Sequence, residues 1–238
     1  MHGLPSGVTL RTGLAVLLLC PMVASSVLAA PVSSGASLAA DRDNDTPPSL
    51  SHPPVAEGVV DRYLLHPRGE VNGLLLQDGT QMHVTSRAAR RLIDIVQPGD
   101  RVRIHGRRID RLPLVEGDVI VNVTDGATLT VPYRLDLPIP PLEERPPVNE
   151  MKAHGTVRFL LYDHLKDDVN GVVLSDGTQV RLPPDVGARF PASLQPGMHL
   201  EVEGYGVDTP HGRVLEATAI GRKGRPLTYL DASTQELR

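Results

Sequence analysis

A row of basic side chains between residues 101 and 108 is the strongest candidate for chemistry in this sequence. Val102 and Ile104 alternate with polar residues, which predicts a half-buried strand with one basic face. Such a face can neutralise phosphates or acidic sugars, so it is the candidate ligand-binding surface. The candidate residues on the face and in the loop after it are Arg101, Arg103, His105, Arg107 and Arg108.

Other chemistry is scarce. The loop 163–168 carries three aspartates that suit calcium, but Lys166 lies among them and the spacing is not that of an EF-hand, so we favour a solvated loop. Nine histidines include no zinc-protease pattern, and no nucleophile elbow, phosphate loop or dinucleotide fingerprint occurs. We therefore predict no catalytic residues, no metal site and no cofactor, and we expect the protein not to be an enzyme.

The elements that position these residues are repeated. Residues 71–81, VNGLLLQDGTQ, recur as residues 169–179, VNGVVLSDGTQ, at an offset of 98. The Gln-Pro-Gly turn at 97–99 recurs at 195–197 with the same offset. Several turn residues that match at one fixed offset indicate two copies of a single module.

The Asp-Gly pairs at 78–79 and 176–177 draw attention because both copies contain them. An aspartate before glycine commonly closes a tight hairpin by bonding its own backbone, so we interpret both pairs as structural. The Asn-Gly pairs at 72–73 and 170–171 are interpreted in the same way, with the glycine marking a bulge where the strand bends.

Each module is expected to contain three strands, one helix and two more strands. In module 1 the pattern predicts strands at 59–65, 71–77, 80–84, 101–107 and 119–123, and a helix at 86–96 capped by Thr85 or Ser86. In module 2 the corresponding helix is weaker, because prolines and glycine interrupt residues 183–194. This order, in a mainly β chain, is that of two tandem five-stranded OB-fold-like barrels, each with a short helix between strands 3 and 4. The alternative is an SH3-like barrel, which usually lacks that helix.

The Val-Asn-Gly strand, the Asp-Gly-Thr turn and the Pro-Gly entry to the fourth strand resemble a group of exported bacterial OB-fold proteins of uncharacterised function. The resemblance covers both modules but not the tails or the connector. It implies a fold and an address outside the cytoplasm, and it supplies no catalytic residues.

Repeat and composition together divide the chain. We expect a signal peptide at 1–29, a disordered tail at 30–54, module 1 at 55–126, a proline-rich connector at 127–150, module 2 at 151–224 and a C-terminal tail at 225–238. The apolar run of the signal, residues 14–19, is shorter than the roughly 20 residues that span a bilayer. We therefore expect a periplasmic or secreted protein with no transmembrane segment in its mature chain. The single cysteine, Cys20, lies in the signal, so the mature chain has no thiol chemistry.

The two predicted fourth strands differ in charge. Where module 1 has Arg101 and Arg103, module 2 has His199 and Glu201, followed by Glu203. Three interpretations stay open: two solvated faces, pairing of the basic face with the acidic one in cis or between chains, and polyanion binding by module 1. A net charge of −4, 3% aromatic residues and ten arginines balanced by ten acids in 55–126 all disfavour nucleic acid. The expected function is binding of an unknown protein or envelope partner, with self-association as one form, and nucleic-acid or other polyanion binding as the alternative.

Overall fold

The computed structural model describes residues 50, 53–131, 147–163, 168–184, 186 and 194–230. The predicted signal peptide, most of the predicted tail at 30–54, the middle of the connector and the end of the C-terminal tail lie outside the described residues. The same holds for most of 183–194, where the weaker second helix was expected. In the part of the chain that is described, no helix has the length and apolar character needed to cross a membrane.

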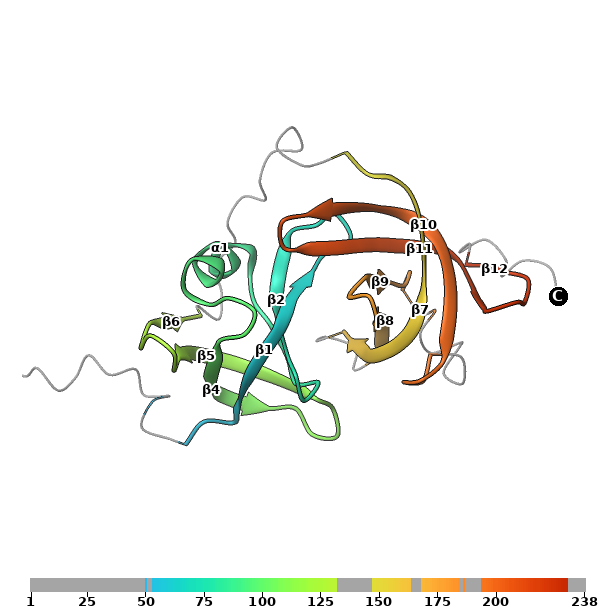
Figure 1. Cartoon of the computed structure of the whole chain (residues 1–238). Helices are drawn as coiled ribbons and strands as arrows, with labels where there is room; N and C mark the ends of the chain where they lie inside the picture. The colour runs from blue at the N-terminus through green and yellow to red at the C-terminus, as the bar shows by residue number, and fades with distance from the viewer. Residues whose placement is uncertain are drawn as a thin grey trace, which may run out of the picture. The chain divides into compact units, whose positions relative to one another are not determined.

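Module 1 is a closed β-barrel with one helix (Figure 1). Its sheet has the order β3-β2-β1-β4-β5-β6, and a parallel pairing of β3 with β5 closes the barrel. The helix lies between β3 and β4, which matches the predicted OB-fold order and not the SH3-like alternative. The elements are β1 (Ala56–Leu65), β2 (Val71–Leu76), β3 (Gln81–His83), α1 (Ser86–Ile95), β4 (Arg101–Arg108), β5 (Leu114–Asn122) and β6 (Thr128–Thr130).

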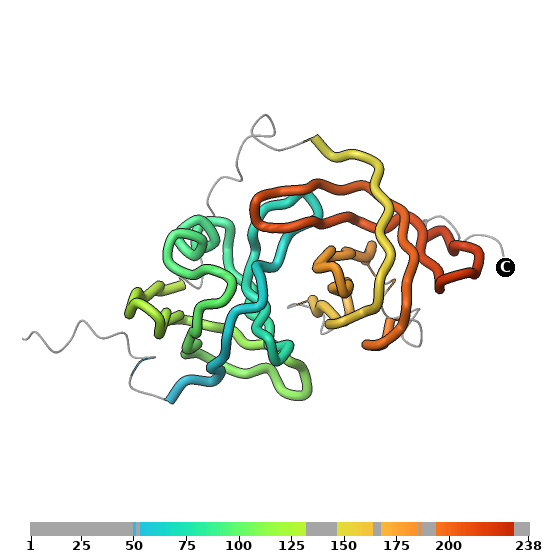
Figure 2. Tube along the Cα trace, viewed as in Figure 1, coloured from blue at the N-terminus to red at the C-terminus, as the bar shows by residue number. Residues whose placement is uncertain are grey.

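Module 2 repeats this topology. Its sheet has the order β10-β7-β8-β9-β11-β12, and it closes through the antiparallel pairing of β10 with β11 and the parallel pairing of β9 with β11. Figure 2 traces module 1 from blue to green and module 2 from yellow to red. The predicted fold class, tandem OB-fold-like barrels in a mainly β chain, is therefore confirmed. The strands are β7 (Asn149–Tyr162), β8 (Val169–Leu174), β9 (Gln179–Arg181), β10 (His199–Thr209), β11 (Gly212–Arg222) and β12 (Thr228–Tyr229).

Strand alternation explains how each barrel is filled. In β2 the side chains of Leu74 and Leu76 point into the core of module 1, and in β8 those of Val172 and Leu174 point into the core of module 2. Helix α1 adds Ala89 and Leu92 to the first core, and Thr85 caps the helix by accepting a hydrogen bond from the Ala88 amide.

The turn residues behave as the repeat predicted. Asp78 Oδ1 accepts a hydrogen bond from the Thr80 amide at 2.9 Å, and Asp176 Oδ1 accepts from the Thr178 amide at 2.9 Å. These carboxylates hold their own turns, which confirms the structural interpretation. Next to each Asn-Gly pair the first strand of the barrel skips a residue of the second: Leu64 pairs with Gly73 and Leu65 with Val71, so Asn72 bulges out of the ladder.

Candidate ligand site at the junction of the two barrels

The predicted basic face of β4 is neutralised within its own barrel. Glu57, on the neighbouring strand β1, accepts from Arg103 Nε at 2.9 Å and lies 3.3 Å from Arg101 Nη1. The hydrogen bond from Arg103, helped by that from Arg101, holds the pKa of the Glu57 carboxyl below its usual value. Two of the five predicted site residues therefore share one carboxylate.

The remaining predicted residues do not continue this face. A β-bulge at Asp118 of β5 shifts the pairing of the two strands between His105 and Gly106, and His105 is only 7% exposed. The expectation that His105 shares the exposed face of Arg101 and Arg103 is therefore wrong. Beyond the bulge, Arg107 Nη2 lies 2.6 Å from Glu116 Oε2, and Arg108 Nη2 donates to the Val55 carbonyl at 3.0 Å.

Module 2 reverses the charges of this face and compensates them in the same way. Strand β7 carries Lys152, whose Nζ lies 2.5 Å from Glu203 Oε1 on β10. That ion pair raises the pKa of Lys152. Module 1 therefore has the acid on its first strand and the cations on its fourth, whereas module 2 has the opposite arrangement. The charge reversal is balanced inside each barrel, and the contacts between the modules use other residues.

The contact between the barrels, which we call the seam, is built on the last residue of the repeated motif. The Gln179 side chain of β9 reaches strand β1 of module 1. Its Nε2 donates to the Tyr63 carbonyl at 2.8 Å, and its Oε1 accepts from the Leu65 amide at 2.9 Å. The amide thus pairs with β1 as a neighbouring strand would, next to the Asn72 bulge.

The equivalent residue of module 1 makes the reciprocal contact. Gln81 Nε2 donates to the Leu160 carbonyl at 2.8 Å, and Gln81 Oε1 accepts from the Tyr162 amide at 3.1 Å. Because Leu160 and Tyr162 occupy the repeat positions of Tyr63 and Leu65, each module offers the other the same surface. This is the arrangement of a two-fold symmetric dimer, made here within one chain.

A small apolar cluster fills the middle of the seam. Leu64 and Leu75 of module 1 pack with Leu161 and Val173 of module 2, all fully buried, and Phe159 packs against them. Leu75 and Val173 lie on the faces of β2 and β8 that point away from the two barrel cores. These strands are therefore buried on both faces.

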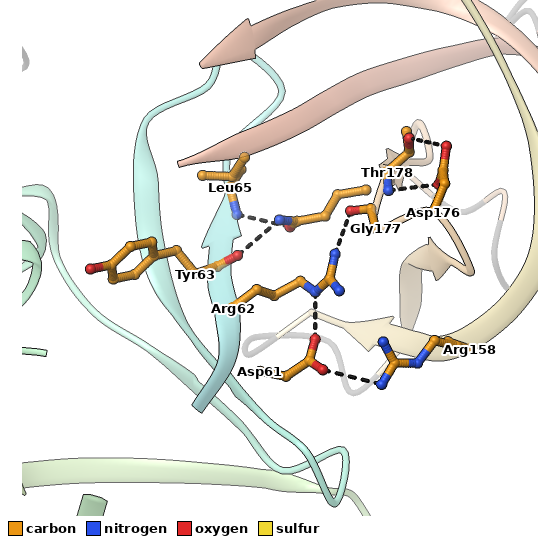
Figure 3. Close-up of polar contacts among 9 residues, drawn as sticks. Asp61, Arg62, Tyr63, Leu65, Arg158, Asp176, Gly177 and Thr178 are labelled. Carbon is orange, nitrogen blue, oxygen red and sulfur yellow. Dashed lines mark hydrogen bonds and ion pairs between the residues drawn. The ribbon is translucent and has the colours of Figure 1, made fainter. Parts of the chain in front are cut away.

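Polar contacts flank the cluster (Figure 3). Asp61 Oδ1 lies 3.1 Å from Arg158 Nη2, and these two residues occupy equivalent repeat positions on β1 and β7. Arg62 bonds Asp61 through its Nε and donates through Nη1 to the Gly177 carbonyl in the Asp-Gly turn of module 2. The Asp-Gly turn of module 2 thus contributes to the seam as well as to its own hairpin.

The hairpin formed by β10 and β11 breaks the symmetry. These strands run as a long two-stranded ribbon (Figure 1), and Val207 and Val214 belong to the hydrophobic core of module 1. The His211 ring lies edge-on to the Tyr63 ring, 5.3 Å away between centroids. Gly69, in the loop between β1 and β2, has φ +91° and lies so close that an added methyl group would be 2.6 Å from Thr209.

A cavity of about 340 Å³ opens at one end of the seam. The bulged Asn72 and its repeat equivalent Asn170 line it, together with His83 of β3 and Arg181 of β9, which occupy equivalent positions. Among the residues that the structure describes, no group of three or more histidine, cysteine or acidic side chains is arranged to hold a metal. The rest of its lining is His66, Pro67, Asp163, Asp168, Val169, Leu182, Pro183 and Pro184.

Arg181 is the central polar residue of the cavity. It is 5% exposed, its Nε donates to the Leu65 carbonyl at 2.8 Å, and its Nη1 donates to Asn170 Oδ1 at 3.1 Å. Burial lowers the pKa of Arg181 to about 10, against an opposing effect of Asp163, so the guanidinium remains charged at neutral pH. On the module 1 side, His83 Nε2 lies 3.2 Å from the Tyr162 carbonyl.

The seam and its cavity were missed by sequence reasoning, although two signals point to them. A strand with one solvent-exposed face alternates apolar and polar residues. Three consecutive apolar residues break this alternation at 74–76 and again at 172–174. A glutamine retained at the same place in both copies, next to a buried strand, is the second signal.

These features define the class of the protein: a chain of two OB-fold-like barrels that contact each other through their first three strands. No protein-family model and no curated protein matches the chain. Among solved structures it is similar to the single-stranded DNA binding protein from Thermus aquaticus, with 15% identity, a TM-score of 0.24, and coverage of 75% of this chain and 95% of that one. A deletion mutant of that protein matches with 15% identity, a TM-score of 0.23, and coverage of 74% and 95%.

Proposed function

We propose that the protein is an exported, non-enzymatic binding protein whose ligand occupies the cavity at the seam of its two barrels. One observation carries the proposal. OB-folds bind oligonucleotides and oligosaccharides on the face of strands 2 and 3 and the adjoining loops. In each module of this chain, that face is buried against the other module. The cavity with Arg181 is the part of the junction that stays open.

A binding experiment tests this proposal. The mature protein is dialysed to equilibrium against a small-molecule extract of the cell envelope, and compounds enriched on the protein side are identified by mass spectrometry. Val169→Trp narrows the cavity, and Val148→Trp places the same bulk on an exposed residue outside it. The parent and Val148→Trp are expected to enrich a compound that Val169→Trp does not. No enrichment by the parent, or equal enrichment by all three proteins, would contradict the proposal.

The alternative function, polyanion binding through Arg101, Arg103, Arg107 and Arg108, is disfavoured by the partners of those residues. Glu57 and Glu116 neutralise three of the four arginines, so a phosphate would have to displace a carboxylate. Helix α1 also carries three exposed arginines that have no ion pair in the described part of the chain, but they do not belong to the predicted basic face. They are Arg87, Arg90 and Arg91. We expect a labelled single-stranded oligonucleotide and heparin to show no salt-dependent binding that Arg103→Glu weakens.

The proposal of export has its own test. Expression of the complete chain in a bacterial host with an outer membrane is expected to release a mature protein into the periplasm. Sequencing of its N-terminus should begin at Ala30, after the predicted cleavage site. A full-length cytoplasmic product would contradict export without touching the proposed cavity site.

A further inference from the structure

The cavity at the seam has an unbalanced set of polar groups. Its volume of about 340 Å³ lies at the lower end of the range of small-molecule sites. Its wall combines aliphatic surface from Val169, Leu182 and Pro183 with donors and acceptors from both modules. Some of these polar groups have no partner among the described residues. Those groups determine which hydrogen-bond donors and acceptors a ligand must have.

The unpaired donor is on Arg181. A guanidinium has five N–H donors in one plane, and Nε and Nη1 of Arg181 are used by Leu65 and Asn170. Its Nη2 is buried and has no hydrogen-bond partner among the residues that the structure describes. Burial of a charged donor without an acceptor is energetically unfavourable, and a carboxylate is the acceptor that fits a guanidinium best.

The unpaired acceptors are on Asn72 and Asp168. Asn72 Oδ1 is buried and has no hydrogen-bond partner in the described part of the chain. The half-buried Asp168 carboxylate has neither a hydrogen bond nor an ion pair among the described residues. An acceptor amide and a carboxylate together suit a group with several N–H donors and a positive charge.

The other titratable groups of the wall already have partners. His83 lies against the Tyr162 carbonyl, and His66 Nδ1 is 3.6 Å from Glu70 Oε2. Asp163 is close enough to Arg181 to act on it electrostatically. A dianion would meet the charges of Asp163 and Asp168, and a simple cation would meet Arg181, so neither fits the whole wall.

We infer that the cavity binds a free α-amino acid with a small aliphatic side chain. Its carboxylate accepts from Arg181 Nη2, its ammonium group donates to Asp168 and to Asn72 Oδ1, and its side chain packs on Val169 and Leu182. The inference rests on the proposed function, because it assigns a ligand class to the same cavity.

Isothermal titration calorimetry of the mature protein tests the inference. The probes are glycine, L-alanine, L-valine and L-leucine, each compared with its carboxamide and its N-acetyl derivative. We expect at least one free amino acid to bind saturably. Each derivative should bind at least about tenfold more weakly, because it removes one of the two charge-assisted contacts.

Two variants place the ligand. Asp168→Asn removes the half-buried negative charge that pairs with the ammonium group of the ligand. It should weaken amino-acid binding by about tenfold. Asp118→Asn makes the same change at an exposed site on module 1 and should leave the affinity unchanged. Asp168→Asn is preferred to a change at Arg181, whose bonds to Leu65 and Asn170 also support the seam.

The outcomes separate the two levels of the argument. Equal affinity of the parent and Asp168→Asn, or equal binding of the free amino acids and their derivatives, overturns the inference. If none of the four amino acids binds but the dialysis experiment still shows enrichment that Val169→Trp abolishes, the ligand class is wrong and the cavity site stands. If neither experiment shows binding, both are wrong.

Discussion

The two modules have the same strands and turns but contribute differently to the junction between them. Each supplies a glutamine, a bulged asparagine and one apolar residue from the outer face of its second strand. Only module 2 adds a long hairpin, whose Val207 and Val214 enter the core of module 1. Module 2 also has Arg181 where module 1 has His83.

This difference shows how a duplicated barrel can keep a symmetric junction and still form one asymmetric site. The reciprocal glutamine contacts hold the barrels in register, and the substitution of arginine for histidine puts a buried charge at one end of the seam. The charged faces of β4 and β10, by contrast, differ in sign, but each is neutralised by an ion pair within its own barrel. The difference that affects the junction is therefore inside it, not on those faces.

The largest effect is expected from the apolar centre of the seam. Leu64 and Leu161 are equivalent residues with 0% exposure, so Leu64→Ala and Leu161→Ala should each lower the free energy of unfolding by about 2–5 kcal/mol. Urea denaturation measures both values. Val148→Ala, at an exposed site, should change stability by less than about 0.5 kcal/mol. A seam variant that behaves like Val148→Ala would show that this side of the junction is not packed.

The glutamines come next. Gln179→Leu and Gln81→Leu each remove one amide and leave a backbone N–H and a C=O of the other module without a partner, at a cost of about 1–3 kcal/mol. The Gln179 variant should be the less stable, because Tyr63 and Leu65 are buried, whereas Leu160 and Tyr162 are half-buried. Gln97→Leu, at an exposed turn, is the control for the leucine itself. The opposite order of the two effects would argue against this ranking by burial.

A substitution in the β10–β11 hairpin of module 2 should lower stability by a smaller amount, and its effect should extend to module 1. Val207→Ala removes two methyl groups from the core of module 1 and should destabilise the protein by about 1.5 kcal/mol. NMR spectra should show the accompanying shifts at Tyr63 and Leu65 of module 1, near which the hairpin packs. Asp208→Ala, an exposed neighbour on the same strand, should leave those signals in place. Shifts confined to module 2 would mean that the hairpin does not enter module 1.

The smallest expected effects concern the charged faces. Arg103→Gln should raise the pKa of Glu57 towards its ordinary value in an NMR pH titration, whereas Arg107→Gln should not change it. Because the pKa of Glu57 is lowered on folding, its contribution to stability is present above the unfolded-state pKa and is lost as the pH falls through the folded-state pKa. In module 2 the sign is opposite: Glu203→Gln should lower the pKa of Lys152. An unchanged Glu57 pKa in Arg103→Gln would contradict the pairing.

The barrels were predictable because their signals are local. Turn pairs such as Asp78-Gly79, the helix period around Leu92 and the alternation around Val102 each depend on residues close in sequence. The seam was not predictable in the same way, because Gln81 and Leu160 are bonded across 79 positions of the chain. The burial of His105 was not predicted, because its place in the alternation of β4 put it on the same face as Arg101 and Arg103.

The two barrels share one interface, and we therefore expect them to unfold as one unit. Differential scanning calorimetry of the mature protein tests it most directly, because a two-state transition requires the calorimetric and van't Hoff enthalpies to agree. We predict a single transition with equal enthalpies, which Gln179→Leu shifts to lower temperature as a whole. Two separate transitions in the parent protein, with only one of them moved by Gln179→Leu, would contradict the account.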